Sequence, residues 1–225
     1  MVFVHKRRVE HEHHQPSAVG LYDPAHEHDA CGVGFVADIK GRRSHTIVRQ
    51  ALQVLINLEH RGACGCEVNT GDGAGILIQM PDTFLRKEAA RLGWDLPAER
   101  GYGAGLIFLP KHPDTRAALE QLFEQMVVEE GQRVIGWRDV PTDNSAVGPS
   151  AVAVQPVFRQ IVIGRGPAMA APRASAEGDA AFERKLFVIR KRMEHAVDAL
   201  DLPGREFFYV VSLSSRTLIY KGMRT

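Results

Sequence analysis

The residue whose type and position suggest chemistry is Cys31, which separates a polar leader from the first apolar segment in the run Asp29-Ala30-Cys31-Gly32-Val33-Gly34-Phe35. If the chain is cleaved before Cys31, one residue carries both a thiol and a free α-amine. Such an amine has an ordinary pKa of about 7.7–8.0, so it can accept a proton near neutral pH. The position therefore predicts a nucleophile and its base on one residue. A buried structural cysteine is the alternative interpretation. The glycines that follow are expected to leave room for a substrate beside the sulfur.

Arg61 is the second candidate, in the run His60-Arg61-Gly62 at the end of a predicted helix. An arginine there often complements the helix dipole. Alternatively, its planar guanidinium points into a site and holds a carboxylate or a carbonyl oxygen. The loop of turn-forming residues at 69–75 favours this second interpretation, because two unusual backbone segments then meet at one helix end.

Three other patterns resemble functional motifs only superficially. The run Cys64-Gly65-Cys66 lacks the second cysteine pair that a zinc site usually has, and His60 does not fill that gap. The glycines of Gly71-x-Gly73-x-Gly75 precede a predicted strand, whereas a dinucleotide fingerprint precedes a helix. The pair Ser214-Ser215 lacks the flanking glycines of a hydrolase elbow, so we expect a turn.

Composition narrows the function classes further. The chain has 225 residues, a net charge of +1, 44% hydrophobic and 24% charged residues. The near-zero charge gives no electrostatic case for nucleic acid or an anionic membrane as partner. Three cysteines make a poor disulfide framework, and no apolar run is long enough to span a membrane. We expect a cytoplasmic protein.

The chain divides into a leader and one domain. Residues 1–30 hold six of the ten histidines and few large apolar groups, which predicts a solvated, disordered leader. The basic start is not followed by the apolar segment of a secretion signal. Residues 31–225 form the predicted domain.

Hydrophobic periodicity and turn signals predict an α+β fold. The firmest element is a helix that Ser44 caps and Gly62 ends, with an apolar stripe along one side. A further helix is expected to be capped by Asp82, and others to begin at Pro113 and near Phe182. Strands are expected at 31–37, 76–80, 106–109, 134–140, 157–163, 207–213 and 217–220, the last two joined as a hairpin through Ser214-Ser215-Arg216, with a linker at 164–179.

Several ordered motifs together resemble the start of the glutamate synthase large subunit. The matching stretches are Cys31–Ala37, Leu55–Cys66, Asn69–Ile76, Gly136–Arg138 with Pro141–Asn144, Phe182–Leu186, Ser212–Thr217 and Tyr220–Met223. The block at 55–76 is very specific. The resemblance covers residues from about 22 to 223.

This resemblance implies a class II glutamine amidotransferase domain of the N-terminal-nucleophile type, with a four-layer αββα sandwich that is incomplete at the C-terminus. Cys31 corresponds to the catalytic cysteine, Arg61 to an arginine at the glutaminase site, and residues 1–30 to a propeptide. The implied reaction hydrolyses glutamine to glutamate and ammonia, and the ammonia then reacts with 2-oxoglutarate in further domains.

The resemblance also implies what this chain lacks. In the family, a later arginine that grips the glutamine carboxylate and an Asn-Gly pair that forms the oxyanion hole lie beyond the equivalent of Thr225. FMN and an iron–sulfur cluster belong to downstream synthase domains, which work with a small reductase subunit in some members. No cofactor or metal is expected in this chain. Each missing oxyanion donor is worth about 2.7–4 kcal/mol, so we expect a truncated chain that is nearly inactive alone. The alternative is an inactive fragment that only packs against or binds a partner.

Overall fold

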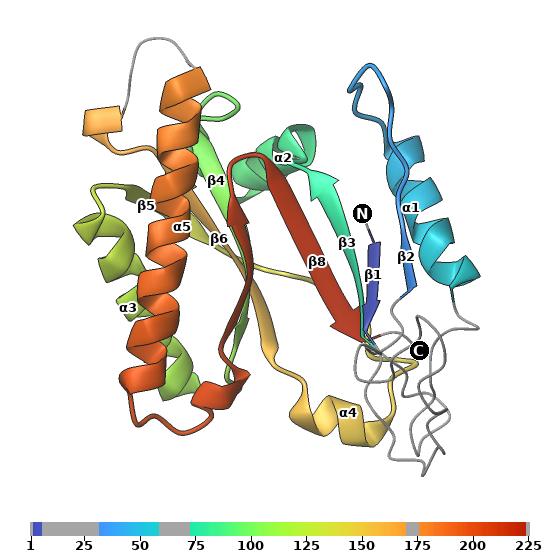
Figure 1. Ribbon diagram of the computed structural model, residues 1–225. Helices are drawn as coiled ribbons and strands as arrows, with labels where there is room; N and C mark the ends of the chain where they lie inside the picture. The colour runs from blue at the N-terminus through green and yellow to red at the C-terminus, as the bar shows by residue number, and fades with distance from the viewer. Residues whose placement is uncertain (1, 6–31, 59–72, 170–175, 224–225) are drawn as a thin grey trace, which may run out of the picture. The chain divides into compact units, whose positions relative to one another are not determined.

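The computed structural model describes residues 2–5, 32–58, 73–169 and 176–223, and the chain forms two compact units (Figure 1). The first unit comprises Met1–Ile76, Ser145–Ala151 and Lys221–Thr225, and the second comprises Leu77–Asn144 and Val152–Tyr220. Helices and antiparallel strands mix along the chain, which confirms the predicted α+β class.

The first unit is built on a glycine-rich sheet. It contains β1 (Val2–His5), β2 (Gly32–Gly34), the start of β3 (Gly73–Gln79), the end of β8 (Thr217–Met223) and the helix α1 (His45–Asn57). The strand order is β2-β1-β3-β8, and β1 is antiparallel to both neighbours. The prediction that the whole leader is disordered is therefore wrong for residues 2–5.

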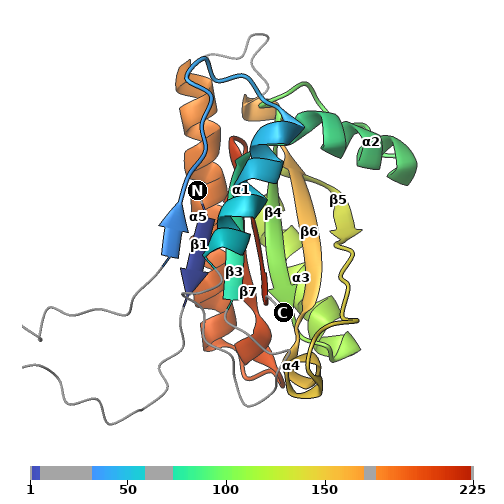
Figure 2. The same cartoon turned by 90° about the vertical axis from the view of Figure 1, so that its right-hand side faces the viewer.

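The second unit contains a four-stranded antiparallel sheet in the order β5-β6-β4-β7. Its strands are β4 (Tyr102–Leu109), β5 (Arg133–Asp139), β6 (Val157–Gly164) and β7 (Tyr209–Ser214). Figure 2 shows β4, β6 and β5 side by side in this order. These strands lie within one to four residues of the predicted positions.

Four α-helices and two 3₁₀ turns complete the second unit and its borders. They are α2 (Asp82–Leu92), α3 (Pro113–Glu129), α4 (Pro149–Val154), α5 (Ala176–Ala199) and two 3₁₀ turns at Pro167–Met169 and Arg205–Phe207. Pro113 opens α3 as predicted, since a proline at the first helical turn removes no intrahelical hydrogen bond. The predicted linker at 164–179 is too long, because α5 begins at Ala176.

Two apolar cores lie on opposite faces of the second unit's sheet. Ile107, Ile161 and Ile163 pack with the helices α3 and α5 on one face, whereas Ala104 and Val162 pack with β8 and α2 on the other. Because side chains alternate along a strand, β4 and β6 supply both cores. In α5 the buried residues recur at helical spacing: Phe182, Leu186, Ile189, Met193 and Val197. The second unit thus has a helical layer, a sheet, and a further layer of strand and helix.

The connection between β7 and β8 differs from the predicted hairpin. Both strands exist, but β7 pairs with β4 in one sheet and β8 lies beside β3 in the other. The turn at Ser215-Arg216 therefore carries the chain from one sheet to the next as a β-arch. Across the arch, the Ser212 hydroxyl accepts a hydrogen bond from the Ile219 amide at 3.1 Å.

Candidate functional site

The two predicted site residues, Cys31 and Arg61, lie outside the described residues, and their roles stay predictions. The structure describes the elements that adjoin them. Strand β2 begins at Gly32, directly after Cys31, and α1 ends at Asn57, four positions before Arg61. Strand β3 begins at Gly73. Strand β2, α1 and the start of β3 belong to the first unit, so that unit supplies the frame from which both residues would be held.

Strand β2 approaches α1 very closely. A Cβ added at Gly34 would lie 2.4 Å from Val54 Cγ1, and one at Gly32 would lie 3.2 Å from the Leu58 methyl groups. Only glycine therefore allows the strand to contact the helix without a shift. On this face of β2 the side chains of α1 fill the space beside both glycines, and the expected room for a substrate beside the Cys31 sulfur stays a prediction.

The helix α1 begins as predicted and ends early. Ser44 has an extended backbone, and its hydroxyl accepts a hydrogen bond from the Ile47 amide at 3.3 Å, which satisfies one of the free donors of the first turn. The helix closes at Asn57 with Leu58 as its cap, so the prediction that Gly62 ends it is wrong. The predicted apolar stripe buries Ala51 but leaves Leu52 exposed.

The predicted glycine loop at 69–75 is shorter than expected. Residues 69–72 lie outside the described residues, and Gly73, Ala74 and Gly75 already belong to β3. They pair with β1 in a register that sets Phe3 opposite Gly75 and Val4 opposite Ala74. These glycines serve strand pairing, so the expected tight turn through Gly75 is wrong.

Two of the motifs noted in the sequence meet at the β-arch. The carboxylate of Glu183, on α5, accepts hydrogen bonds from the amide of Ser215 at 2.6 Å, from the Ser214 hydroxyl at 3.0 Å and from the Ser215 hydroxyl. Ser215 is buried. The serine pair thus forms a turn, as predicted, and is held by a carboxylate that sequence reasoning did not single out. The sequence signal that could have indicated Glu183 is the family resemblance, in which the stretches Phe182–Leu186 and Ser212–Thr217 both match.

A second polar cluster surrounds the buried Arg138. Its guanidinium forms an ion pair with Glu88 at 2.8 Å and donates to Gln160 Oε1 at 3.1 Å. Hydrogen bonds from Arg91 and from Arg138 lower the pKa of Glu88 to about 2. The carboxylate of Glu88 and the amide oxygen of Gln160 compensate the charge of Arg138, which explains why a buried arginine is tolerated.

Helix α2 begins with a related arrangement. The N-cap residue of this helix is Pro81 and Asp82 is its first helical residue, so the predicted Asp82 cap is wrong. Its carboxylate instead accepts from Tyr102 at 2.8 Å and pairs with Arg86. Burial of Tyr102, with this hydrogen bond, raises the pKa of its phenol.

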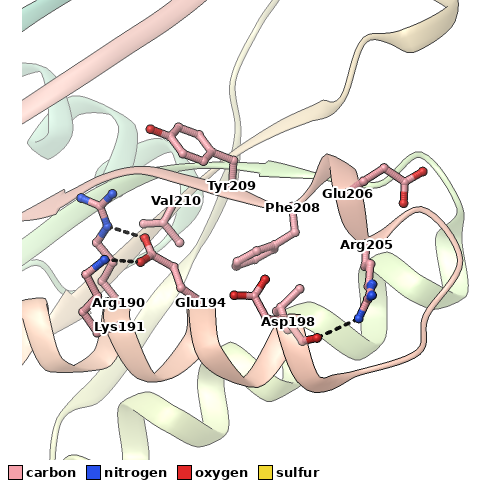
Figure 3. Close-up of a pocket in the computed structure, with 10 residues that line it drawn as sticks. Arg190, Lys191, Glu194, Asp198, Arg205, Glu206, Phe208, Tyr209 and Val210 are labelled. Atoms are coloured by element: carbon pink, nitrogen blue, oxygen red, sulfur yellow. Dashed lines mark hydrogen bonds and ion pairs between the residues drawn. The ribbon is translucent and has the colours of Figure 1, made fainter.

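A cavity of about 540 Å³ lies in the second unit between α5 and the start of β7 (Figure 3). Its charged side chains bond mainly to protein groups: Glu194 pairs with Arg190 and Lys191, and Arg205 donates to the backbone carbonyl of Asp198. Asp198 and Glu206 add two further carboxylates to its lining.

Two searches of the described residues gave negative results. In residues 2–5, 32–58, 73–169 and 176–223, no group of three His, Cys, Asp or Glu side chains could hold a metal ion. Among the helices of these ranges, none combines the length and apolar character that crossing a membrane requires. The cysteines at 64 and 66, considered for zinc above, lie outside these ranges.

Comparison with known families matches residues 31–225 to class-II glutamine amidotransferases. The chain belongs to the class-II glutamine amidotransferase family. The match begins at Cys31 and leaves out residues 1–30. It includes Arg61 and the whole second unit, so both described units carry amidotransferase sequence.

Curated relatives of this amidotransferase chain are glutamate synthases. The chain is 42% identical over 212 residues to the glutamate synthase [NADPH] large chain of Bacillus subtilis, covering 93% of this chain and 13% of that protein. It is 41% identical over 209 residues to glutamate synthase [NADH] of Schizosaccharomyces pombe, covering 92% and 10%. It is 36% identical over 197 residues to ferredoxin-dependent glutamate synthase 2 of Synechocystis, covering 88% and 12%. The chain therefore spans about an eighth or less of these relatives.

Proposed function

We propose that this chain is the glutaminase part of a glutamate synthase, in which Cys31 hydrolyses glutamine to glutamate and ammonia. The observation that carries the proposal is the amidotransferase match over residues 31–225, which begins at the cysteine that sequence reasoning singled out. Relatives named for NADPH, NADH and ferredoxin dependence align with the same segment. The shared segment is therefore independent of the electron donor, as a glutaminase would be.

The chemistry follows from one residue. The α-amine of Cys31 takes the thiol proton, and the thiolate attacks the side-chain carbonyl carbon of glutamine. The C–N bond breaks as the amine returns its proton to the leaving ammonia, and a γ-glutamyl thioester remains. Water then attacks the thioester, which releases glutamate and restores the thiol. One glutamine and one water give one glutamate and one ammonia.

Residues 1–30 act in this scheme as a propeptide, because the α-amine of Cys31 is free only after cleavage before it. Arg61 contributes a planar, permanently charged donor set that suits a carboxylate or carbonyl oxygen of the bound glutamine. The proposed fold is the four-layer αββα sandwich. Its support is the helix–sheet–strand layering of the second unit and the contact of α1 with β2 in the first.

The released ammonia reacts with 2-oxoglutarate in synthase domains outside these residues, with a small reductase subunit as a further partner and the cytoplasm as the compartment. FMN and an iron–sulfur cluster would serve that half-reaction. No group of described residues fits such a cluster, so we derive no step of glutamine hydrolysis through either cofactor.

The proposal is tested in a chimera. Residues 1–225 replace the aligned segment of the Bacillus subtilis glutamate synthase large chain, and glutamate formation is measured with glutamine or with ammonium as nitrogen source. Cys31→Ala should abolish the glutamine-dependent reaction and leave the ammonium-dependent reaction intact. Cys64→Ser is the matched control and should retain both reactions.

Two outcomes would overturn the proposal. One is a Cys31→Ala chimera that still uses glutamine at the parental rate. The other is an active chimera whose intact mass still includes residues 1–30, because its Cys31 amine would then be blocked. A chimera with ammonium-dependent activity alone would favour an inactive packing module.

A further inference from the structure

The leader contributes a strand to the sheet that carries the predicted nucleophile. Strand β1 lies between β2 and β3, with Val2 opposite both Gly34 and Ile76, and Phe3 opposite both Val33 and Gly75. Strand β2 stands at the edge of this sheet, and within the described residues β1 is its sole strand neighbour. The segment directly after Cys31 is thus joined to the sheet through the leader.

The segments that pair with β1 are rich in glycine. Strand β2 reads Gly-Val-Gly, and β3 begins Gly-Ala-Gly. Glycine loses the most backbone entropy on ordering and packs no side chain, so both segments depend on a partner strand. Strand β1 reads Val-Phe-Val-His, and β-branched and aromatic residues favour extended structure. The leader therefore supplies strand-forming residues beside β2 and beside the Gly-Ala-Gly start of β3.

We infer that β1 is a placeholder strand, which holds β2 in the sheet of the precursor and is given up when the leader is removed. The pairing rests on the register described above, whereas its loss rests on the proposed cleavage before Cys31. While residues 6–31 tether β1, the strand is an intramolecular partner with a high effective concentration. Cleavage ends that advantage. Strand β2 then loses its described partner and is free to adopt the position that the mature site requires.

Hydrogen–deuterium exchange on the full chain tests the pairing without any activity measurement. Phe3→Pro removes a backbone donor from the middle of an interior strand. Amides of Val33, Gly34 and the 73–76 segment should then exchange at least tenfold faster, whereas β4 and β6 keep their protection. Val9→Pro, in the same leader but outside β1, is the matched control and should leave all four segments unchanged. Unchanged exchange in Phe3→Pro would overturn the inference.

If Phe3→Pro unfolds the whole chain, a disulfide cross-link tests the pairing of β1 with β2 instead. Phe3→Cys with Val33→Cys joins residues that face each other across β1 and β2, and Val33 is half exposed, so a cysteine is tolerated there. The pair is made with Cys31→Ser to remove the neighbouring thiol. Mild oxidation should link residues 3 and 33 in most molecules, while Phe3→Cys with Ile39→Cys stays unlinked. Equal linking of both pairs would refute the register, whatever the outcome for glutaminase activity.

Discussion

The carboxylate of Glu183 offers the sharpest test of how the second unit is held together. It accepts hydrogen bonds from the Ser215 amide and from the hydroxyls of Ser214 and Ser215 at the β-arch. A hydrogen bond to a charged group is worth about 1.5–3 kcal/mol, and a buried donor left unpaired costs about 1–3 kcal/mol. Because the two hydroxyls can rotate toward other acceptors, the Ser215 amide dominates. We expect Glu183→Ala to lower the free energy of unfolding by about 3 kcal/mol.

Urea unfolding followed by tryptophan fluorescence measures this loss, since both tryptophans, Trp94 and Trp137, belong to the second unit. Glu183→Gln keeps one acceptor oxygen and should lose only about 1 kcal/mol. Glu177→Ala, an exposed position on the same helix, is the control and should lose less than about 1 kcal/mol, from its weak interaction with the helix dipole. If Glu183→Ala loses no more than this control, the carboxylate does not fasten the arch.

Two further predictions address packing and charge. Gly34→Ala places a Cβ 2.4 Å from Val54 Cγ1, so it should destabilise the first unit by about 1–3 kcal/mol. Hydrogen exchange in α1 measures this loss. If Gly34→Ala has an equal effect in a Val54→Ala background, the clash with Val54 is not its cause. The pKa of Glu88 lies at about 2, below the ordinary 4.5, because of its hydrogen bonds from Arg91 and Arg138. A lowered carboxyl pKa adds stability above about pH 4.5 that disappears as the pH falls toward 2. Glu88→Gln should therefore reduce the difference between urea midpoints at pH 5 and pH 3, and an unchanged difference would count against the ion pair.

Much of the second unit was predictable, because its elements carry strong local signals. In α5 the apolar residues recur every three or four positions, and each predicted inward residue from Phe182 to Val197 is buried. Helix α3 has a proline at its start and buries Leu119 and Phe123. Strand β6 contains the apolar run Ile161, Val162 and Ile163 and ends at a glycine. In these segments the secondary-structure propensity, the hydrophobic periodicity and the residues at the element ends all indicate the same element. The tertiary structure therefore keeps the element that the local sequence favours.

The β-arch could not be predicted from its own residues. A turn of the Ser-Ser-Arg type suits a hairpin and an arch equally well, and the difference lies in which distant strands β7 and β8 join. Strand β7 pairs with β4, about a hundred residues earlier in the chain. The hydrogen-bond acceptor that holds the turn is Glu183 on α5. Rules for turns use only the residues of the turn itself, so they cannot indicate an acceptor on a separate helix. Non-local pairing of this kind is decided by the buried faces of several elements together.

The leader strand was missed because composition was averaged over thirty residues. Val2, Phe3 and Val4 are strongly strand-forming, but the histidines and charges that follow dominate the count for residues 1–30. The glycines of β3 led to a different error, in which strand residues were predicted to form a turn. Gly73 and Gly75 were assigned to a turn because glycine is common there, whereas here they belong to a strand whose neighbour supplies the side chains. For the candidate site itself, the sequence predicts Cys31 and Arg61, and both their roles and their geometry stay predictions.

The distribution of buried side chains gives these errors a common cause. Among the described residues, the buried apolar side chains of the first unit are Ala51, Ile76 and Ala151, whereas the second unit contains both large cores. Large apolar groups such as Phe35 and Ile39 are exposed in the first unit. Burial is the main source of stability, and among the described residues beside Cys31 the observed interactions are backbone pairing and close glycine contacts. A region stabilised in this way responds strongly to the gain or loss of one strand. That sensitivity suits a segment whose proposed activation is the removal of its own leader.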